Sequence, residues 1–228
     1  MNAAAHDPFT ELPDPELARR IAAGDEAALR VLMRRHNQTL HRTARSILKE
    51  DADAEDAVQE AWILAYRSIG GFRGEARLST WLVRIVVNES IGRLRKRNRH
   101  AGVVHLVDDG TTAGDAPDQP GLPEREAMRS EARRLLEARI DALPDVFRTV
   151  FMLRGIEEFT VEEVAIALGI PEATVRTRYF RARGLLRESI AREIDTGFEE
   201  AFAFDGERCD RMIEHVLARL HAASVAGT

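Results

Sequence analysis

The chain has 228 residues and a formal charge of −5, and 44% of its residues are hydrophobic while only 6% are aromatic. This length suits one or two compact domains, and the abundance of Ala, Leu, Glu and Arg favours helices over a β-sandwich or barrel. The sequence has no apolar run long enough to span a bilayer and no amino-terminal export signal, and its single cysteine, Cys209, excludes a disulfide framework and a cysteine-based zinc finger. We therefore expect a cytoplasmic, mainly helical protein that holds no metal or other cofactor.

Charge is distributed unevenly along the chain. Residues 73–99 carry eight basic and two acidic side chains, a local charge of +6, whereas residues 100–124 carry five acidic side chains and no Lys or Arg. The acidic segment also contains three prolines, and chain breakers combined with like charges favour an extended linker. This linker divides the sequence into an amino-terminal and a carboxy-terminal helical block.

Four helices are expected in the amino-terminal block. Asp14 should cap the first helix and Asp25 the second. The third ends at Gly70-Gly71 and carries an apolar stripe formed by Val58, Ala61, Trp62, Ala65 and Ile69. The fourth begins near Ser79 or Thr80 and is apolar nearly all round before it becomes basic, so we expect its start to be buried and its end to face an anion.

The side of the third helix opposite its apolar stripe is acidic. It is formed by Asp53, Glu55, Asp56, Gln59 and Glu60. Such a face is either ordinary solvated surface or a docking site for a basic partner protein, and the residues themselves leave both interpretations open.

A glycine-containing loop, residues 72–81, joins the third and fourth helices beside the basic segment. Aromatic side chains near such a loop can hold unstacked bases while arginines contact phosphates. A tryptophan at the start of an apolar helix more often belongs to the core, so Trp81 favours burial, whereas Phe72 fits the core and the base-binding loop equally. Asn88 is either a satisfied buried amide or a reader of a base edge, since its amide both donates and accepts.

The carboxy-terminal block begins with a helix from about Glu126 to Ala142, followed by one from Asp145 to near Gly155. Thr160 and Glu163 then have the spacing of a capping box. The short helix that they begin should end at Gly169, which can adopt the left-handed backbone conformation of a tight turn. Pro171 can open a further helix, and the pair has the pattern of a helix-turn-helix.

The second helix of this motif has two distinct sides. Its expected core stripe consists of Val175, Tyr179, Ala182 and Leu186. Its outer side carries Arg176, Thr177, Arg178, Phe180, Arg181, Arg183 and Arg187. A cationic, partly aromatic face suits the major groove of DNA, where arginine pairs with guanine. The alternative is a solvated helix face, against which a phenylalanine between arginines argues.

With these motifs, the sequence resembles the extracytoplasmic-function group of bacterial RNA polymerase sigma factors in the sigma-70 family. The resemblance rests on residues 53–62, 72–82 with 87–88, 143–144, 161–178 and 181–183. It implies an all-α fold of two small helical domains with a flexible linker between them. Its segments would be a sigma region 2 bundle at 12–99, the acidic linker at 100–124, a sigma region 4 helix-turn-helix at 125–195 and an extension at 196–228.

The resemblance also implies a role for each surface. The clamp coiled coil of core RNA polymerase would be bound by Asp53, Asp56, Gln59 and Glu60. The non-template single strand of the −10 element would be captured by Phe72, Arg73, Ala76, Ser79 and Asn88. The −35 duplex would be read by Arg176, Thr177, Arg178, Phe180 and Arg181. Further implied contacts are the polymerase flap, the active-site channel for the linker, and an anti-sigma protein; membrane insertion is not implied.

Two other function classes compete with this interpretation. A stand-alone helix-turn-helix regulator would use the same recognition helix, but it would leave the basic helix, the aromatic loop and the acidic linker without a role. An enzyme is not supported, because the histidines and carboxylates form no metal or nucleophile constellation and no catalytic residue is assigned. After Gly197 we expect a smaller amphipathic helix around Met212 that docks on the protein or on a regulator, with Cys209 as a small apolar residue or an oxidant sensor.

Overall fold

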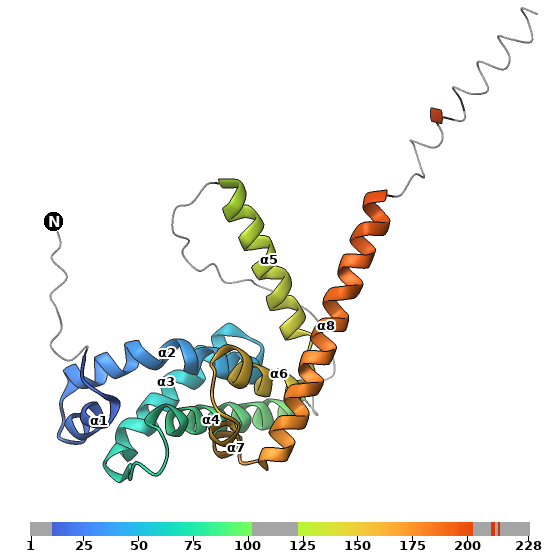
Figure 1. Cartoon of the computed structure of the whole chain (residues 1–228). Helices are drawn as coiled ribbons and strands as arrows, with labels where there is room; N and C mark the ends of the chain where they lie inside the picture. The colour runs from blue at the N-terminus through green and yellow to red at the C-terminus, as the bar shows by residue number, and fades with distance from the viewer. Residues whose placement is uncertain (1–10, 102–122, 203–210, 213, 215–228) are drawn as a thin grey trace, which may run out of the picture. The chain divides into compact units, whose positions relative to one another are not determined.

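The structure, a computed structural model, describes residues 11–101, 123–202, 211, 212 and 214. Every regular element within these ranges is a helix (Figure 1), which confirms the all-α expectation. None of the described helices is both long and apolar enough to cross a bilayer. Most of the acidic linker, Cys209 and most of the expected helix around Met212 lie outside the described residues. The chain divides into a compact unit, residues 1–186, and a second unit, residues 187–228.

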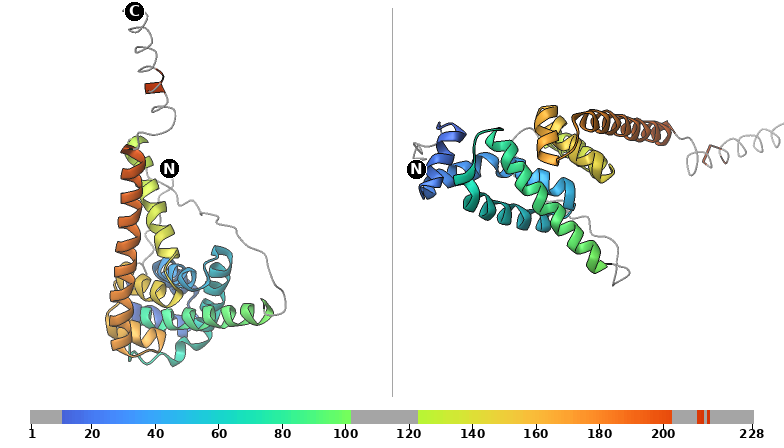
Figure 2. Two further views of the ribbon diagram at one scale, coloured as in Figure 1. Left: turned by 90° about the vertical axis from the view of Figure 1, so that its right-hand side faces the viewer. Right: turned by 90° about the horizontal axis from the view of Figure 1, so that it is seen from below.

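Three long helices, α2 (Glu26–Leu48), α3 (Asp51–Ser68) and α4 (Leu78–Ala101), pack against one another in the amino-terminal block (Figures 1 and 2). The shorter α1 (Asp14–Ala22) packs on α2 and on the single turn η1 (Ile69–Gly71). The predicted stripe of α3 is buried, which confirms the periodicity argument. Within this stripe Trp62 remains compatible with the core because its indole N–H donates to Asn37 Oδ1 at 2.7 Å.

Of the two helix caps predicted in the amino-terminal block, one is confirmed and one is wrong. Asp25 Oδ1 accepts hydrogen bonds from the amides of Ala27 and Ala28, as an N-cap does. Asp14 instead lies in the first turn of α1, and its carboxylate accepts from Arg35 and from His36 Nε2. Burial raises the pKa of Asp14, but the hydrogen bonds from His36 and Arg35 outweigh it and hold that pKa below its ordinary value.

The carboxy-terminal block contains five further helical elements. They are α5 (Pro123–Asp141), α6 (Asp145–Phe151), the π-helical turn η2 (Met152–Ile156), α7 (Val161–Leu168) and α8 (Glu172–Phe202). Helix α8 continues through Gly197 to Phe202 and so reaches into the predicted extension, residues 196–228. Within the first unit α8 is represented by its amino-terminal half, which ends at Leu186.

Both helical blocks contribute to the first unit. Helix α6 and η2 pack on α2, and α7 packs on α4. Buried residues of the carboxy-terminal block, among them Val150, Leu153 and Val164, belong to the same apolar cluster as Leu32 and Leu82 of the bundle. The two blocks therefore share one core in this structure.

Replacing Asp14 with Asn should lower the free energy of unfolding at neutral pH by about 1–2 kcal/mol, because a neutral amide accepts weaker hydrogen bonds than a carboxylate. The folded-state pKa of Asp14 lies below the ordinary value of 3.8, so this contribution is complete above 3.8 and is lost as the pH falls through the lowered pKa. Urea denaturation of both proteins between pH 7 and pH 2 measures the difference. Glu55→Gln, at an exposed position of α3, serves as the control. A difference that persists unchanged at pH 2 would contradict the assignment.

Candidate nucleic-acid interface

The helix-turn-helix forms as its local residues predict. Thr160 Oγ1 accepts from the amide of Glu163 at 3.1 Å, and the Glu163 carboxylate accepts from the amide of Thr160 at 2.8 Å. This capping box begins α7, and Gly169, which follows the last helical residue, caps its end with a left-handed φ of 64°. The carbonyl of Pro171 then accepts from the amide of Val175 at 3.1 Å and starts α8.

Tyr179 fixes the inner side of α8 against the preceding helices. Val175 and Ala182 are fully buried beside it. The Tyr179 ring stacks on Phe151 with ring centres 6.2 Å apart, and the guanidinium carbon of Arg154 lies 5.5 Å from its centre. Aromatic stacking and a cation–π contact on one ring restrict how α8 can rotate. The predicted core stripe is thus confirmed at its centre.

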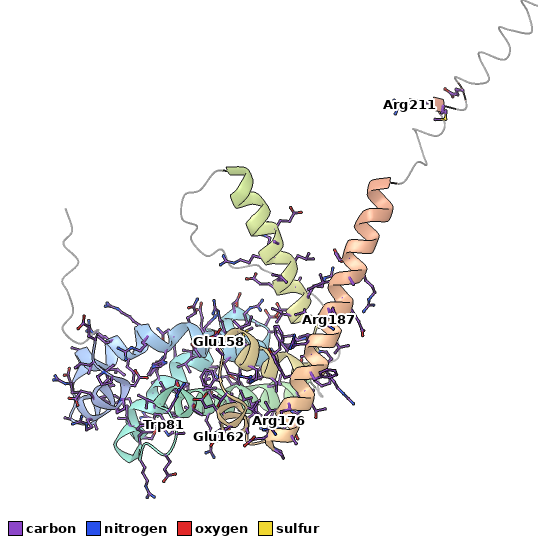
Figure 3. All side chains as sticks on the ribbon, viewed as in Figure 1. Trp81, Glu158, Glu162, Arg176, Arg187 and Arg211 are labelled. Atoms are coloured by element: carbon purple, nitrogen blue, oxygen red, sulfur yellow. The ribbon has the colours of Figure 1, made fainter. Side chains whose placement is uncertain are left out.

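The opposite side of α8 is a cationic surface with an aromatic residue in it. Arg176, Thr177 and Arg181 are exposed, and the Phe180 side chain is 79% exposed. Arg178 differs from these residues in that it is half-buried, because it borders the core stripe. Figure 3 labels Arg176 on this part of α8.

Two members of this surface already have partners within α8. Arg176 Nη2 lies 2.5 Å from a carboxylate oxygen of Glu172, one helical turn earlier. Thr177 Oγ1 donates to the carbonyl of Ala173 at 2.9 Å. A base or phosphate bound by Arg176 would therefore have to replace Glu172 as its partner.

The glycine-containing loop before α4 borders a hollow of about 490 Å³. Phe72 and Trp81 are both half-buried there, with ring centres 5.5 Å apart. The hollow is lined by Gly71, Phe72, Arg73, Gly74, Glu75, Ala76, Trp81, Arg84 and Ile166. Its volume lies in the range of small-ligand pockets, and two aromatic rings beside arginines provide both stacking surface and positive charge.

The residues predicted to capture a base are only partly brought together. Phe72, Arg73 and Ala76 line the hollow, whereas Ser79 and Asn88 do not. Asn88 is exposed, which excludes the buried amide. It lies one turn beyond Arg84 and two turns beyond Trp81, and therefore shares their helix face.

Two lining residues were not identified by sequence reasoning. Arg84 could have been found, since it follows Trp81 by three positions on one helix face. Ile166 belongs to α7 and reaches the hollow only through the packing of α7 on α4, for which the sequence contains no local signal.

The acidic face of α3 is partly neutralised by the basic end of α4. Asp53 Oδ2 accepts from Arg97 Nη1 at 2.9 Å, and Asp56 Oδ2 lies 3.7 Å from Arg93 Nη1. Of the other predicted members, Gln59 is exposed and Glu60 half-buried.

The same face continues into apolar residues. Ile63 is 44% exposed and lies four positions beyond Gln59, and Tyr66 is 43% exposed and lies three positions further on. Sequence reasoning missed this apolar continuation, although both residues lie off the core stripe of α3. The described part of the chain contains no group of three His, Cys, Asp or Glu side chains that could hold a metal ion.

Two family descriptions match the chain at the positions of these surfaces. Residues 32–100, which contain the acidic face and the loop, match Sigma-70 region 2. Residues 133–186, which contain the helix-turn-helix, match Sigma-70, region 4.

Full-length relatives show the same relationship. The chain is 32% identical over 190 residues to the RNA polymerase sigma-H factor of Pseudomonas aeruginosa, an alignment that covers 80% of this chain and 96% of the relative. It is 35% identical over 188 residues to the ECF RNA polymerase sigma-E factor of Haemophilus influenzae, covering 79% and 96%. With the sigma-E factor of Escherichia coli it shares 33% identity over 178 residues, covering 76% and 92%.

Solved structures are similar in fold. CnrH, solved in complex with the cytosolic domain of CnrY, matches with a TM-score of 0.55 and 25% identity, covering 78% of this chain and 97% of CnrH. The sigma factor RpoE of Bartonella quintana, solved in complex with the anti-sigma factor NepR, matches with a TM-score of 0.58 and 24% identity, covering 70% and 94%.

Two glycine-to-alanine replacements should change the free energy of unfolding in opposite directions. Gly169→Ala should destabilise the protein by about 1–2 kcal/mol, because an L-residue is strained in the left-handed conformation. Gly184→Ala should stabilise it by up to about 1 kcal/mol, since this glycine lies inside α8 with open space around its missing Cβ. Denaturant unfolding curves of the two variants measure both effects, and the same sign for both would contradict the turn geometry.

Proposed function

The chain belongs to the extracytoplasmic-function group of the sigma-70 family of RNA polymerase sigma factors, and from this premise we propose which of its residues perform the family's task. A member of this family binds core RNA polymerase and promoter DNA and directs the initiation of transcription. We also propose that the protein acts in the cytoplasm. It catalyses no reaction of its own, since RNA synthesis is carried out by the core enzyme.

In our proposal, α8 enters the major groove of the −35 element. Arg176 and Arg181 contact bases or phosphates, Thr177 and Phe180 supply a hydroxyl and an apolar contact, and Arg178 contacts the backbone from the edge of the surface. The observation that carries the proposal is the 79% exposure of Phe180 on a cationic helix face. An aromatic ring left in water costs free energy that contact with thymine methyl groups would recover.

The hollow beside the loop takes a base of the non-template strand at the −10 element. Phe72 and Trp81 supply rings for stacking, and Arg73 and Arg84 attract the neighbouring phosphates. Asn88 reads a further base from the same face of α4. Ala76, which lines the hollow, and Ser79 contact the same strand. Capture of an extruded base lowers the free energy of strand separation, because a base can enter the hollow only after it has left the duplex stack.

The acidic face of α3 binds the clamp coiled coil of the polymerase. Asp53, Asp56, Gln59 and Glu60 provide its charged and polar part, and Ile63 and Tyr66 extend it with apolar area. Apolar area flanked by charge is a typical protein-binding surface. Because Asp53 and Asp56 are paired with arginines of α4, basic groups on the polymerase would compete with those arginines.

An anti-sigma protein is a further candidate partner. The matched structure of Bartonella quintana RpoE contains the anti-sigma factor NepR. We extend this kind of partner to the present chain because the relationship covers most of both chains. The stand-alone regulator, in contrast, accounts for α8 but leaves the hollow and the α3 face without a role.

Core RNA polymerase, genomic DNA and the purified chain together should produce RNA whose 5′ ends follow a common pair of upstream sequence elements. Sequencing these 5′ ends is the decisive test. A chain that binds duplex DNA tightly by itself and leaves the start sites of core polymerase unchanged would overturn the proposal in favour of a stand-alone regulator.

Arg181→Ala should weaken initiation at these promoters by about 5- to 150-fold, the equivalent of one lost arginine–base contact of about 1–3 kcal/mol. It should also relax the preference at one −35 position, while co-purification with core polymerase stays unchanged. Arg134→Ala, an exposed arginine of α5, is the matched control. An unchanged −35 preference in R181A would count against the assigned role of α8.

Asn88→Ala should impair strand opening and leave the initial duplex complex intact, because its amide is proposed to contact an unpaired base. Permanganate reactivity of promoter thymines measures opening, and a filter-binding assay measures the duplex complex. Asn98→Ala, exposed further along α4, should change neither quantity. Equal thymine reactivity in N88A and wild type would remove Asn88 from the site.

A further inference from the structure

A second hollow borders the loop before α4 from the side of α1. Its volume is about 250 Å³, and its lining includes Ala18, Arg19 and Ala22 of α1, Ile69 of η1 and residues 72–74 of the loop. The same three loop residues also line the hollow that contains Trp81, so the two hollows share this short segment as a wall. We refer to the hollow that contains Trp81 as the first hollow and to the second one as the α1 hollow.

The two hollows are as close together as successive nucleotides of one strand. The Cα atoms of Phe72 and Gly74, the ends of the shared wall, are at most about 7 Å apart, since two residues of extended chain span no more. Successive nucleotides of a duplex strand are separated by about 3.4 Å along the axis, and unstacking lengthens this step. A strand with one base in the first hollow can therefore place the adjacent base in the α1 hollow.

The α1 hollow has an apolar floor and a cationic rim. Ala18 and Ile69 are buried, and Phe72 is half-buried between the two hollows. The side chain of Arg19 is 78% exposed and pairs with a glutamate of its own helix, and Arg73 is exposed beside it. An aromatic ring with arginines around it is the combination that binds an unpaired nucleotide. The volume is below the range of drug-sized pockets, which suits a single base.

The wall that α1 contributes is fixed before DNA binds. Leu17 and Ile21 anchor α1 in the core, and the Asp14 carboxylate accepts from Arg35 and from His36 of α2. Figure 1 shows α1 beside the start of α2, and α1 also packs on η1. A preformed hollow binds a base without the cost of ordering its walls. Helix α1 also precedes residue 32, where the match to Sigma-70 region 2 begins, so that family description does not include this wall.

The direction of the strand follows from the position of α4. This helix extends from the loop away from α1 (Figures 1 and 2), and its far end, residues 93–99, carries five basic side chains and no acidic one. Duplex DNA has a higher charge density than a single strand, so this end suits the paired DNA upstream of the −10 element. A non-template strand that leaves the duplex there passes the first hollow and then the α1 hollow in the 5′ to 3′ direction.

We propose that the α1 hollow binds the base that follows, on the 3′ side of the non-template strand, the base held in the first hollow. This inference rests on the proposed function and extends it from one captured base to two. Phe72 lies between the two bases, and Arg19 contacts the phosphate of the second. Two bases held on different sides of one ring cannot stack on each other again, so both contribute to keeping the strand unpaired.

Filling the α1 hollow separates its role from that of the first hollow. Ala22→Phe adds a ring at a position that lines only the α1 hollow. Ala23→Phe adds the same ring one position later, where it lines neither hollow, and is the matched control. Both alanines are exposed, so neither substitution should prevent folding, which circular dichroism and a thermal melt check. Trp81→Ala perturbs the first hollow for comparison.

The quantity to measure is the dissociation constant of the complex of the chain with core polymerase on a forked promoter whose −10 non-template strand is already unpaired. The promoter is one mapped by 5′-end sequencing, and abasic sites replace its −10 bases one at a time. Removal of a captured base should weaken binding by the wild type at least about fivefold. A22F should weaken binding to the intact promoter to a similar extent, and the abasic site at the second captured base should cost A22F nothing further. W81A should show this non-additivity one nucleotide earlier, and A23F should match the wild type throughout.

Three results would overturn the α1 hollow as a base site. They are an affinity of A22F equal to that of the wild type, a loss of affinity in A22F that is the same on every template, and non-additivity of A22F at the same nucleotide as W81A. W81A without non-additivity at any nucleotide would overturn the first hollow, and with it the capture of two successive bases. A wild-type chain that does not direct core polymerase to promoters would instead overturn the proposed function.

Arg19→Ala tests the phosphate contact separately. It should weaken binding to all −10 sequences alike and reduce the slope of log K against log salt concentration by about 0.7, the value for one phosphate contact on a single strand. Arg30→Ala, an exposed arginine of α2 that lines neither hollow, should leave the slope unchanged. A slope in R19A equal to that of the wild type would overturn the assigned role of Arg19.

Discussion

One guanidinium, that of Arg148, determines where the carboxy-terminal block meets the bundle. It is fully buried, and it donates to the carbonyl of Ser46 on α2 at 2.6 Å, to two carbonyls at the α5–α6 corner and to Asp145 Oδ1. A buried cation is tolerated only where its donors are satisfied, since an unpaired one costs several kcal/mol. The Leu143-Pro144 corner therefore has to lie beside the end of α2, and α6, η2 and α7 follow from that position.

Charged side chains of the proposed binding surfaces already form ion pairs within the chain. On α8 Arg176 has Glu172 as its partner, and on the acidic face of α3 Asp53 and Asp56 have arginines of α4 as partners. Exposed ion pairs of this kind contribute at most about 1 kcal/mol each, because water and salt screen them. Replacement of an internal ion-pair partner by a group of DNA or of polymerase consequently costs little free energy.

The helix ends that were predicted correctly are stabilised by interactions between residues that lie close together in the sequence. Asp25 and the Thr160–Glu163 box form hydrogen bonds with amides no more than three positions away. Gly169 has a positive φ, which a glycine adopts without strain. Asp14 was misassigned because Arg35 and His36, more than twenty positions away, compete for its carboxylate. Such distant partners leave no local pattern in the sequence.

In the candidate site, too, some features could be predicted from the sequence and others depend on packing. The exposed side of α8 follows from helical periodicity, and so does most of the loop that borders the hollow. The contribution of Ile166 to the hollow and the contact of Glu157 with Thr39 and Arg42 of α2 could not be predicted, because they depend on how two separately patterned blocks pack. Arg148 is a similar case: in the sequence it is indistinguishable from the many surface arginines, and only the carbonyls that surround it reveal its role.

The contact between the blocks combines apolar and polar side chains, and the two kinds have different effects. Val150, Leu153 and Val164 belong to the same buried cluster as Leu32 and Leu82, and burial of apolar area contributes about 25 cal/mol per Å² whatever its exact orientation. Glu157 accepts from Thr39 and Arg42, and Asp141 accepts from Arg45. Each such bond contributes only about 1–3 kcal/mol net, but only at one geometry. The apolar part therefore holds the blocks together, whereas the directional polar part determines in which orientation they meet.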